Sequence, residues 1–272
     1  MKNNLKRALI SILLLNIILI ITCRVTLADD SKARKIMEKV DALDDGDNGT
    51  LDMTMILIDK NGKKRVRKIR SFTKDRGEDA LRLMFFISPA DVKDTGFLTH
   101  DYDDPKKDDD QWLYLPALRK TKRIASTDKS GSFMGSDLNY SDMTSRNLED
   151  YDFTLIKEMD VRGNKVWLIE SIPRTKKVIK ETGYKKSFLF VRQDNYFVIR
   201  AINWVKDSGY MKYVDVKKLK LIDGILVSTE RHVTRKMGKK ILHKTILRRK
   251  NVKFNQKMSF DMFKPRRLEK GL

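Results

Sequence analysis

The chain has 272 residues, of which 58 are basic and 37 are acidic, so its formal net charge is +21 at pH 7. Its single cysteine excludes a fold held together by several disulfides. Such a positive charge indicates a nucleic acid, an anionic membrane surface or an acidic protein as partner.

A secretory signal peptide is predicted for residues 1–28. Three basic residues precede an apolar run over 8–21, which is shorter than the roughly 20 residues that span a bilayer. Thr26-Leu27-Ala28 then places small residues where a signal peptidase cleaves, so the exported chain is predicted to start at Asp29. An uncleaved membrane anchor is the alternative.

Cys23 lies inside this segment, in a sequence that resembles a lipoprotein cleavage box except for Thr22. Cleavage after Ala28 would leave 244 residues without a thiol, which suits the bacterial periplasm; a lipid anchor at Cys23 is the alternative. The removed segment holds four cations and no acid, so the remaining net charge is +17. Export argues against a nucleic acid and leaves an anionic membrane surface, an acidic protein or a solvated basic face.

The spacing of apolar residues predicts one helix followed by many strands in a single domain, residues 29–272. Apolar side chains recur at three- and four-residue spacing over 31–43, which predicts a helix with Ser31 as its cap. Alternation then begins at Leu51, and Asn61-Gly62 predicts a hairpin turn. Further strands are predicted over 63–72, 80–87, 95–99, 111–115, 153–158, 166–172, 187–192, 196–205, 211–221, 225–234 and 240–250. Such a meander curls into a barrel or half-barrel.

Three segments fall outside the predicted strands. The acidic stretch 101–110 lacks the spacing of a calcium loop and is predicted to be a solvated, flexible excursion. Residues 141–149 are predicted to form a short helix. Residues 259–263 are predicted to form a helical turn that anchors Phe260 and Phe263.

The sequence contains none of the common nucleophile, phosphate-loop, dinucleotide or zinc-protease motifs, so it offers no catalytic residue, metal site or cofactor. His232 and His243 would face each other if the hairpin turn lies at Met237-Gly238, with Glu230 on the same face. Since a zinc site needs three or four ligands, a solvated histidine pair is favoured.

The stretch from Asp110 to Asp142 gives the strongest local signal. A short apolar strand over 111–115 leads directly into a basic run. The four cations of this run are candidates for contact with a lipid head group or a partner surface: Arg119, Lys120, Lys122 and Arg123.

Gly131 and Gly135 bracket two apolar residues, Phe133 and Met134, where a loop should be polar. This pattern predicts either a loop that inserts both side chains into its own core or a mobile lip over an apolar cavity.

Large or soft apolar side chains along the strands would line a cavity if the meander does not close, although filling the core is the simpler role for any one of them. The candidate lipid-binding residues are Phe85, Trp112, Tyr114, Phe133, Met134, Trp167 and Phe197.

Two neighbouring motifs resemble the outer-membrane lipoprotein-sorting protein family, the LolA-like periplasmic carriers, and in particular the branch associated with RND-type lipid exporters. They are Gln-Trp-Leu-Tyr-Leu-Pro-Ala-Leu-Arg-Lys-Thr-Lys-Arg-Ile at 111–124 and Gly-Ser-Phe-Met-Gly-Ser-Asp at 131–137. The resemblance covers most of residues 29–272. It implies a mainly β fold, an open antiparallel half-barrel with an N-terminal helix and a helical and loop lid over an apolar cleft.

The resemblance also implies a function without catalysis: a periplasmic carrier of a lipid or an acylated protein, working with an inner-membrane RND-type transporter. At about 0.8 kcal/mol per methylene, one long acyl chain would contribute roughly 10 kcal/mol before ordering costs. A lipid-sensing module on the same scaffold and a secreted hydrolase of acyl or glycosidic bonds are the alternatives. Co-purified lipid would favour the carrier or the sensor, and turnover of a simple ester would favour the hydrolase.

Overall fold

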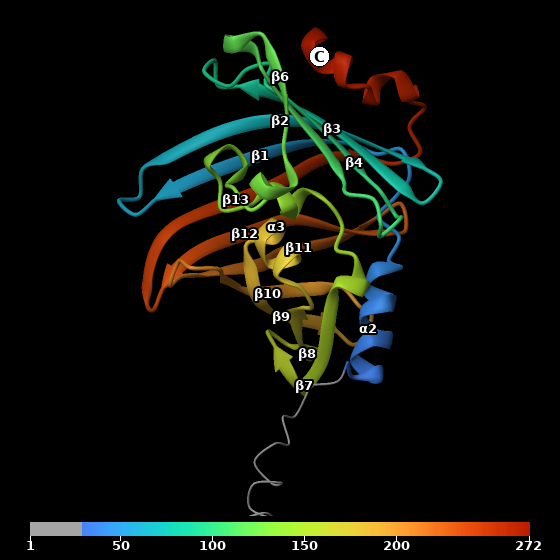
Figure 1. Cartoon of the computed structure of the whole chain (residues 1–272), viewed down its shortest axis with the longest axis vertical. Helices are drawn as coiled ribbons and strands as arrows, with labels where there is room; N and C mark the ends of the chain where they lie inside the picture. The colour runs from blue at the N-terminus through green and yellow to red at the C-terminus, as the bar shows by residue number, and fades with distance from the viewer. Residues whose placement is uncertain (1–28) are drawn as a thin grey trace, which may run out of the picture.

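Thirteen antiparallel strands form one open sheet in the computed structural model, which describes residues 29–272 (Figure 1). The predicted signal peptide, with Cys23, lies outside the described residues. The strands are β1 Thr50–Asp59, β2 Lys64–Arg76, β3 Asp79–Ser88, β4 Gly96–Asp101, β5 Asp110–Leu115, β6 Lys120–Arg123, β7 Tyr151–Val161, β8 Asn164–Pro173, β9 Tyr184–Arg192, β10 Val198–Val205, β11 Met211–Ile222, β12 Ile225–Met237 and β13 Lys240–Lys253.

The order of the strands explains why the sheet stays open. It runs β6-β5-β4-β3-β2-β1-β13-β12-β11-β10-β9-β8-β7, so the first strand pairs with the last, with Met55 opposite Leu247. Because β1 and β13 join in the middle, β6 and β7 become the two free edges, at opposite ends of the fan in Figure 1. Residues 124–150, here called the lid loop, connect these two edges across one face of the sheet, here called the concave face.

Two α-helices in the described part of the chain, α2 Ser31–Asp41 and α3 Lys176–Thr182, accompany the sheet. Asp30, not the predicted Ser31, caps α2: its Oδ1 accepts hydrogen bonds from the amides of Lys32 at 2.8 Å and Ala33 at 3.4 Å. The carboxylate suits this position because it satisfies amides that lack helical partners. The buried face of α2 packs on the concave face near β7 to β10.

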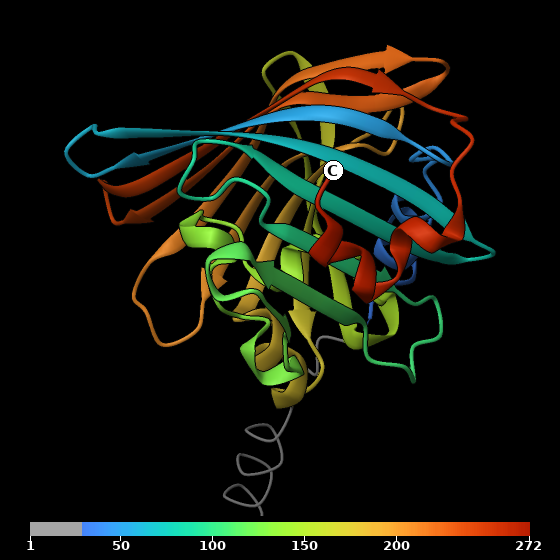
Figure 2. The same cartoon turned by 90° about the horizontal axis from the view of Figure 1, so that it is seen from above.

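The C-terminal segment covers the opposite, outer face of the sheet. Its 3₁₀ turns η6 Phe260–Phe263 and η7 Pro265–Lys270 lie over β3 to β6 (Figure 2). Phe263 and Leu268 are buried there against Leu83 and Leu98. Phe260 is 48% exposed, so the prediction that both phenylalanines anchor the turn is wrong for Phe260.

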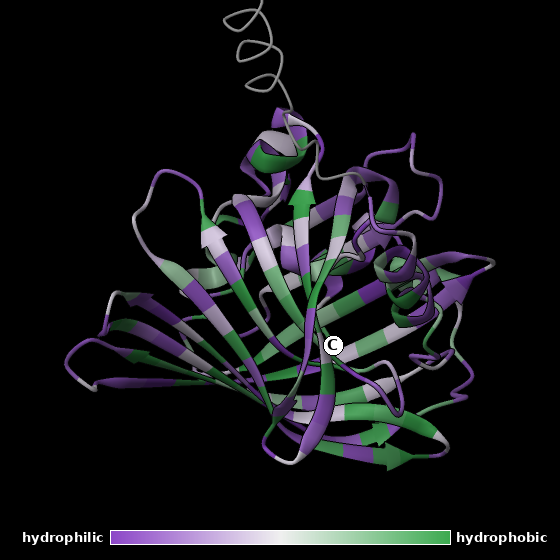
Figure 3. Cartoon of the chain, turned by 90° about the horizontal axis from the view of Figure 1, so that it is seen from below, coloured by the Kyte–Doolittle hydropathy of each residue, from purple (hydrophilic) through white to green (hydrophobic). Residues whose placement is uncertain are grey.

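Most predicted strands are present, and bands of hydrophobic and hydrophilic residues alternate along them (Figure 3). Strand β6 and helix α3 were not predicted, and the helix expected over 141–149 is replaced by the 3₁₀ turns η4 Tyr140–Met143 and η5 Leu148–Asp150. The acidic stretch is not wholly solvated, since Asp101 is buried and binds Arg82 and Ser145. No helix among the described residues is long and apolar enough to cross a bilayer.

Candidate functional site

The lid loop is anchored to the concave face by Phe133. This side chain is 1% exposed, and its ring centroid lies 5.0 Å from that of Phe97 and 5.6 Å from that of Tyr140. Met134 is half-buried beside the same cluster. Phe133 is therefore packed in the buried cluster beneath the lid loop, as the first of its two predicted roles requires, and its role as a mobile lip stays a prediction.

A buried carboxylate in the lid loop contacts β12 and β13, in the middle of the sheet. Asp137 accepts a hydrogen bond from the Thr245 hydroxyl at 2.8 Å, and its Oδ2 lies 2.7 Å from His243 Nδ1. Arg235 Nε on β12 lies 3.5 Å from the other oxygen, Oδ1. Since a buried charge is stable only when it is paired, these contacts hold the middle of the lid loop against β12 and β13.

A second polar network fixes the lid loop to β9 and β11, on the side of the sheet that ends at β7, whereas Phe133 packs on the side that ends at β6. The ammonium of Lys212 on β11 donates to Asn139 Oδ1 at 2.6 Å, and Tyr184 OH on β9 donates to Asp142 Oδ2 at 2.8 Å. Burial lowers the pKa of Lys212, and burial together with the Asp142 charge raises the pKa of Tyr184. The lid loop thus spans both halves of the sheet, and sequence reasoning did not detect this network.

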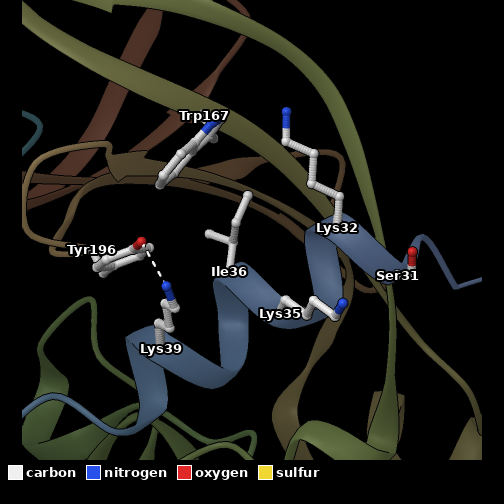
Figure 4. Close-up of a pocket in the computed structure, with 7 residues that line it drawn as sticks. All are labelled: Ser31, Lys32, Lys35, Ile36, Lys39, Trp167 and Tyr196. Atoms are coloured by element: carbon white, nitrogen blue, oxygen red, sulfur yellow. Dashed lines mark hydrogen bonds between the residues drawn. The ribbon is translucent and has the colours of Figure 1, made fainter.

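A pocket of about 300 Å³ lies between α2 and the sheet (Figure 4). Trp167 and Tyr196 form one wall, with their rings stacked at a centroid distance of 5.6 Å, and Ile36 faces them from α2. Lys39 donates to Tyr196 OH at 3.0 Å, and Lys32 and Lys35 also line the pocket. The volume is at the low end for ligand sites, and aromatic walls with a lysine rim fit a small apolar group with an anionic end.

The seven candidate lipid-binding residues do not line one surface. Trp167 lies on the concave side, packed near α2, and Phe133 and Met134 belong to the lid loop. Phe85, Trp112 and Tyr114 instead lie on the outer face beneath the C-terminal segment, and Phe197 lies in a second outer cluster with Phe190. The candidates lie on two faces because successive side chains of a strand point to opposite sides, and the sequence does not say which side is covered. Their role in lipid binding stays a prediction.

Other apolar residues on the concave face were not singled out. Met53 and Met84 are half-buried beside the lid-loop cluster, and Met143 contributes from the lid loop itself. Their flexible side chains suit a surface that must accept apolar ligands of varied shape. Alternation along β1 and β3 could have identified them once the covered face was known.

The basic run lies at the free edge of the sheet. Arg119, Lys120, Lys122 and Arg123 are all exposed, on β6 or just before it. Arg123 is bound to Asp110, and Lys122 Nζ lies 3.9 Å from Asp128. Arg119 and Lys120 are the cations of this run most available to an anionic partner.

The two histidines of the last hairpin do not face each other. Met237 pairs with Lys240 and the register shifts after Arg235, so His243 lies opposite Arg235 and His232 lies opposite Ile246. His232 Nε2 instead lies 2.8 Å from Glu230 Oε1. Over residues 29–272, no group of three potential metal ligands lies together.

Comparisons with known proteins agree with this architecture. A family model with the description "Uncharacterized protein" matches residues 78–270. The crystal structure of a DUF1329 family protein from Desulfovibrio piger is 27% identical with a TM-score of 0.81, and the match covers 89% of this chain and 99% of that chain. Comparison with curated protein sequences finds no match.

Two further structures are similar. One, described as an outer-membrane lipoprotein-sorting protein domain from Vibrio parahaemolyticus, is 28% identical with a TM-score of 0.79 over 88% of this chain and 98% of that one. The other, a LolA superfamily protein from Nitrosomonas europaea, is 14% identical with a TM-score of 0.64 over 85% and 97%, and shows the fold alone. The chain belongs to the DUF1329 family, and it has the open half-barrel fold of its LolA-like structural neighbours.

Proposed function

We propose that the protein is a periplasmic carrier that binds the acyl chains of a lipid or a lipoprotein on its concave face and shuttles this cargo between membranes. The observation that carries the proposal is the kind of structure that covers the concave face. A single loop and a helix, rather than a second sheet, lie over a face rich in half-buried apolar side chains. A loop that spans the opening can move aside without breaking a strand pair.

The physics of a carrier fits this arrangement. Each methylene that leaves water contributes about 0.8 kcal/mol, so apolar contacts alone can retain an acyl chain. Release requires the cover to open, and the lid loop is held by discrete polar contacts at Asp137 and Asn139. Binding and release need no catalytic residue, so we propose a function without catalysis.

Similarity to other proteins supports a proposal for the route of the cargo. The Vibrio parahaemolyticus structure that is 28% identical is described as a lipoprotein-sorting domain. The motifs at 111–124 and 131–137 resemble the branch associated with RND-type exporters, so we propose an inner-membrane transporter of this type as the donor. The exposed cations at the β6 edge, Arg119 and Lys120, would contact its anionic surface or an anionic membrane.

Native mass spectrometry of protein purified from the cell envelope without detergent tests the proposal. The expected result is a complex with one acylated molecule, identified after extraction, and transfer of that molecule from donor to acceptor vesicles. Intact mass would show a chain that starts at Asp29; an acylated Cys23 at the N-terminus would contradict cleavage after Ala28. Absence of both bound lipid and transfer would overturn the carrier function, and turnover of a simple ester would favour a hydrolase.

A further inference from the structure

Two arginines project from the middle of the concave face. Arg231 on β12 lies opposite Leu247 on β13, and Arg249 lies two residues beyond Leu247 on the same strand. Alternate residues share a face, so both arginines lie on the face that carries Met55, the residue paired with Leu247 on β1. Diagonal neighbours of this kind are about 7–8 Å apart.

Neither side chain forms an ion pair or a hydrogen bond with any residue among 29–272 that the structure describes. The Nε of Arg231 is enclosed and has no hydrogen-bond partner. Other arginines of the sheet differ: Arg82 binds Asp101, and Arg248, the neighbour of Arg249 on the outer face, lies 3.2 Å from Glu230. Buried charges are normally paired, so the two unpaired guanidinium groups require an explanation.

The surroundings of the two arginines disfavour their charged form. Burial is the main cause that lowers the pKa of Arg231, and burial followed by the charges of Arg231 and Arg82 lowers the pKa of Arg249 to about 10. Both side chains nevertheless keep some accessible surface. A small ligand can therefore reach both residues. A guanidinium group stays protonated at pH 7 even when burial lowers its pKa.

Asp142 is the carboxylate whose charge acts on Arg231, but it does not bind either arginine. Asp142 in the lid loop favours the charged form of Arg231 from a distance. Its Oδ2 accepts hydrogen bonds from Tyr184 OH at 2.8 Å and from the amide of Asn139 at 2.7 Å, and its Oδ1 lies 3.1 Å from the same hydroxyl. Among residues 29–272 the pair therefore has no bound carboxylate, and its cross-strand partners are apolar: Met53 lies opposite Arg249 and Leu247 lies opposite Arg231.

We propose that Arg231 and Arg249 bind the oxyanion of the cargo's head group, a phosphate or a carboxylate, while the acyl chain lies on the apolar concave face. The planar guanidinium fork matches such oxyanions in two hydrogen bonds, and a low-dielectric setting strengthens them. This assignment rests on the proposed carrier function and narrows its cargo to anionic amphiphiles.

The test compares a fluorescent long-chain fatty acid with its neutral methyl ester and with inorganic phosphate, using the chain from Asp29. The variants are Arg231→Gln, Arg249→Gln and the double variant, with Arg248→Gln as the matched control because it lies on the outer face. We expect the parent protein and the control to bind the acid about 10- to 100-fold more tightly than the ester. The double variant should lose this preference and bind the ester as before.

Thermal melting separates binding from folding. Removing an unpaired buried charge should leave Tm unchanged or raise it, whereas a structural role for the arginines would lower it. Should the double variant fail to fold, an acid-induced rise in Tm of the parent protein that the ester does not produce still tests the assignment.

The remaining outcomes overturn distinct statements. Equal binding of acid and ester by the parent protein overturns the head-group site and leaves the carrier function standing, as does an unchanged preference in the double variant. Binding of neither amphiphile overturns both. If inorganic phosphate binds only when both arginines are present, and the acid is not preferred over the ester, the pair binds a free anion. That result overturns its assignment to a lipid head group.

Discussion

Replacing Phe133 by Ala tests whether this residue is core or cover. Its ring is 1% exposed and lies within 6.2 Å, centroid to centroid, of Phe86, Phe97 and Tyr140. Truncation of a buried phenylalanine costs about 3–5 kcal/mol in the free energy of unfolding. For a chain of this size each kcal/mol corresponds to roughly 2–4 °C, so Tm should fall by about 6–20 °C.

Two control variants make the result specific. Phe133→Leu keeps most of the buried volume and should cost less than about 1.5 kcal/mol. Met134→Ser changes a half-buried neighbour and should cost about 1 kcal/mol. Thermal melting and displacement of a fluorescent fatty acid are measured on all three. An unchanged Tm for Phe133→Ala with faster lipid release would refute the core assignment and restore the lip.

Three further predictions follow from other parts of the fold. Reversing Arg119 and Lys120 to Glu should weaken sedimentation with anionic vesicles at low salt while Tm stays within about 1 °C, because exposed charges contribute little to stability. Unchanged sedimentation would show that these cations are only solvated. Burial, a hydrogen bond to Asp47 and neighbouring carboxylates raise the pKa of Asp75 from 3.8 to about 7. The folded state therefore binds this proton more tightly than the unfolded state does. The stability gained in this way is complete below about pH 4 and is lost as the pH rises to 7. Urea denaturation should show that loss and a flatter profile for Asp75→Asn; identical profiles would contradict it. Addition of oleate should shift the tryptophan emission of the parent protein and of Trp112→Phe but not of Trp167→Phe. The reason is that Trp167 lines the pocket beneath α2 and Trp112 lies on the outer face. A shift that is lost in Trp112→Phe instead would place the lipid on the outer face.

The existence and type of the elements could be predicted from local pattern. Alternation located the strands, and apolar spacing located α2, because these periods reflect backbone geometry alone. The short strand β6 was missed because its four residues carry no apolar alternation. The cap of α2 was misplaced by one residue, since Asp30 and Ser31 are both good caps and only the fold shows which amides each can reach.

The partners of buried polar groups could not be predicted from the sequence. Asp137 and His243 are 106 positions apart in the chain, and Lys212 and Asn139 are 73 apart. Nothing local distinguishes such a residue from a solvated one. The histidine pairing failed because Met237 pairs with Lys240, which places the turn one residue later than predicted, and because a register shift beside Arg235 displaces the partners by one more residue.

The class of the fold, the family resemblance and the position of the exposed basic run could all be predicted from the sequence, because each depends on short segments of the chain. Which face of each strand is covered depends instead on contacts between distant segments. Phe85 and Trp112 went to the outer face and Trp167 to the concave face because β1 pairs with β13, which leaves β6 and β7 as free edges bridged by the lid loop. The same long-range pairing brought Arg231 and Arg249 onto one face without a carboxylate, since strand period fixes only that side chains alternate, and packing fixes what each of them meets.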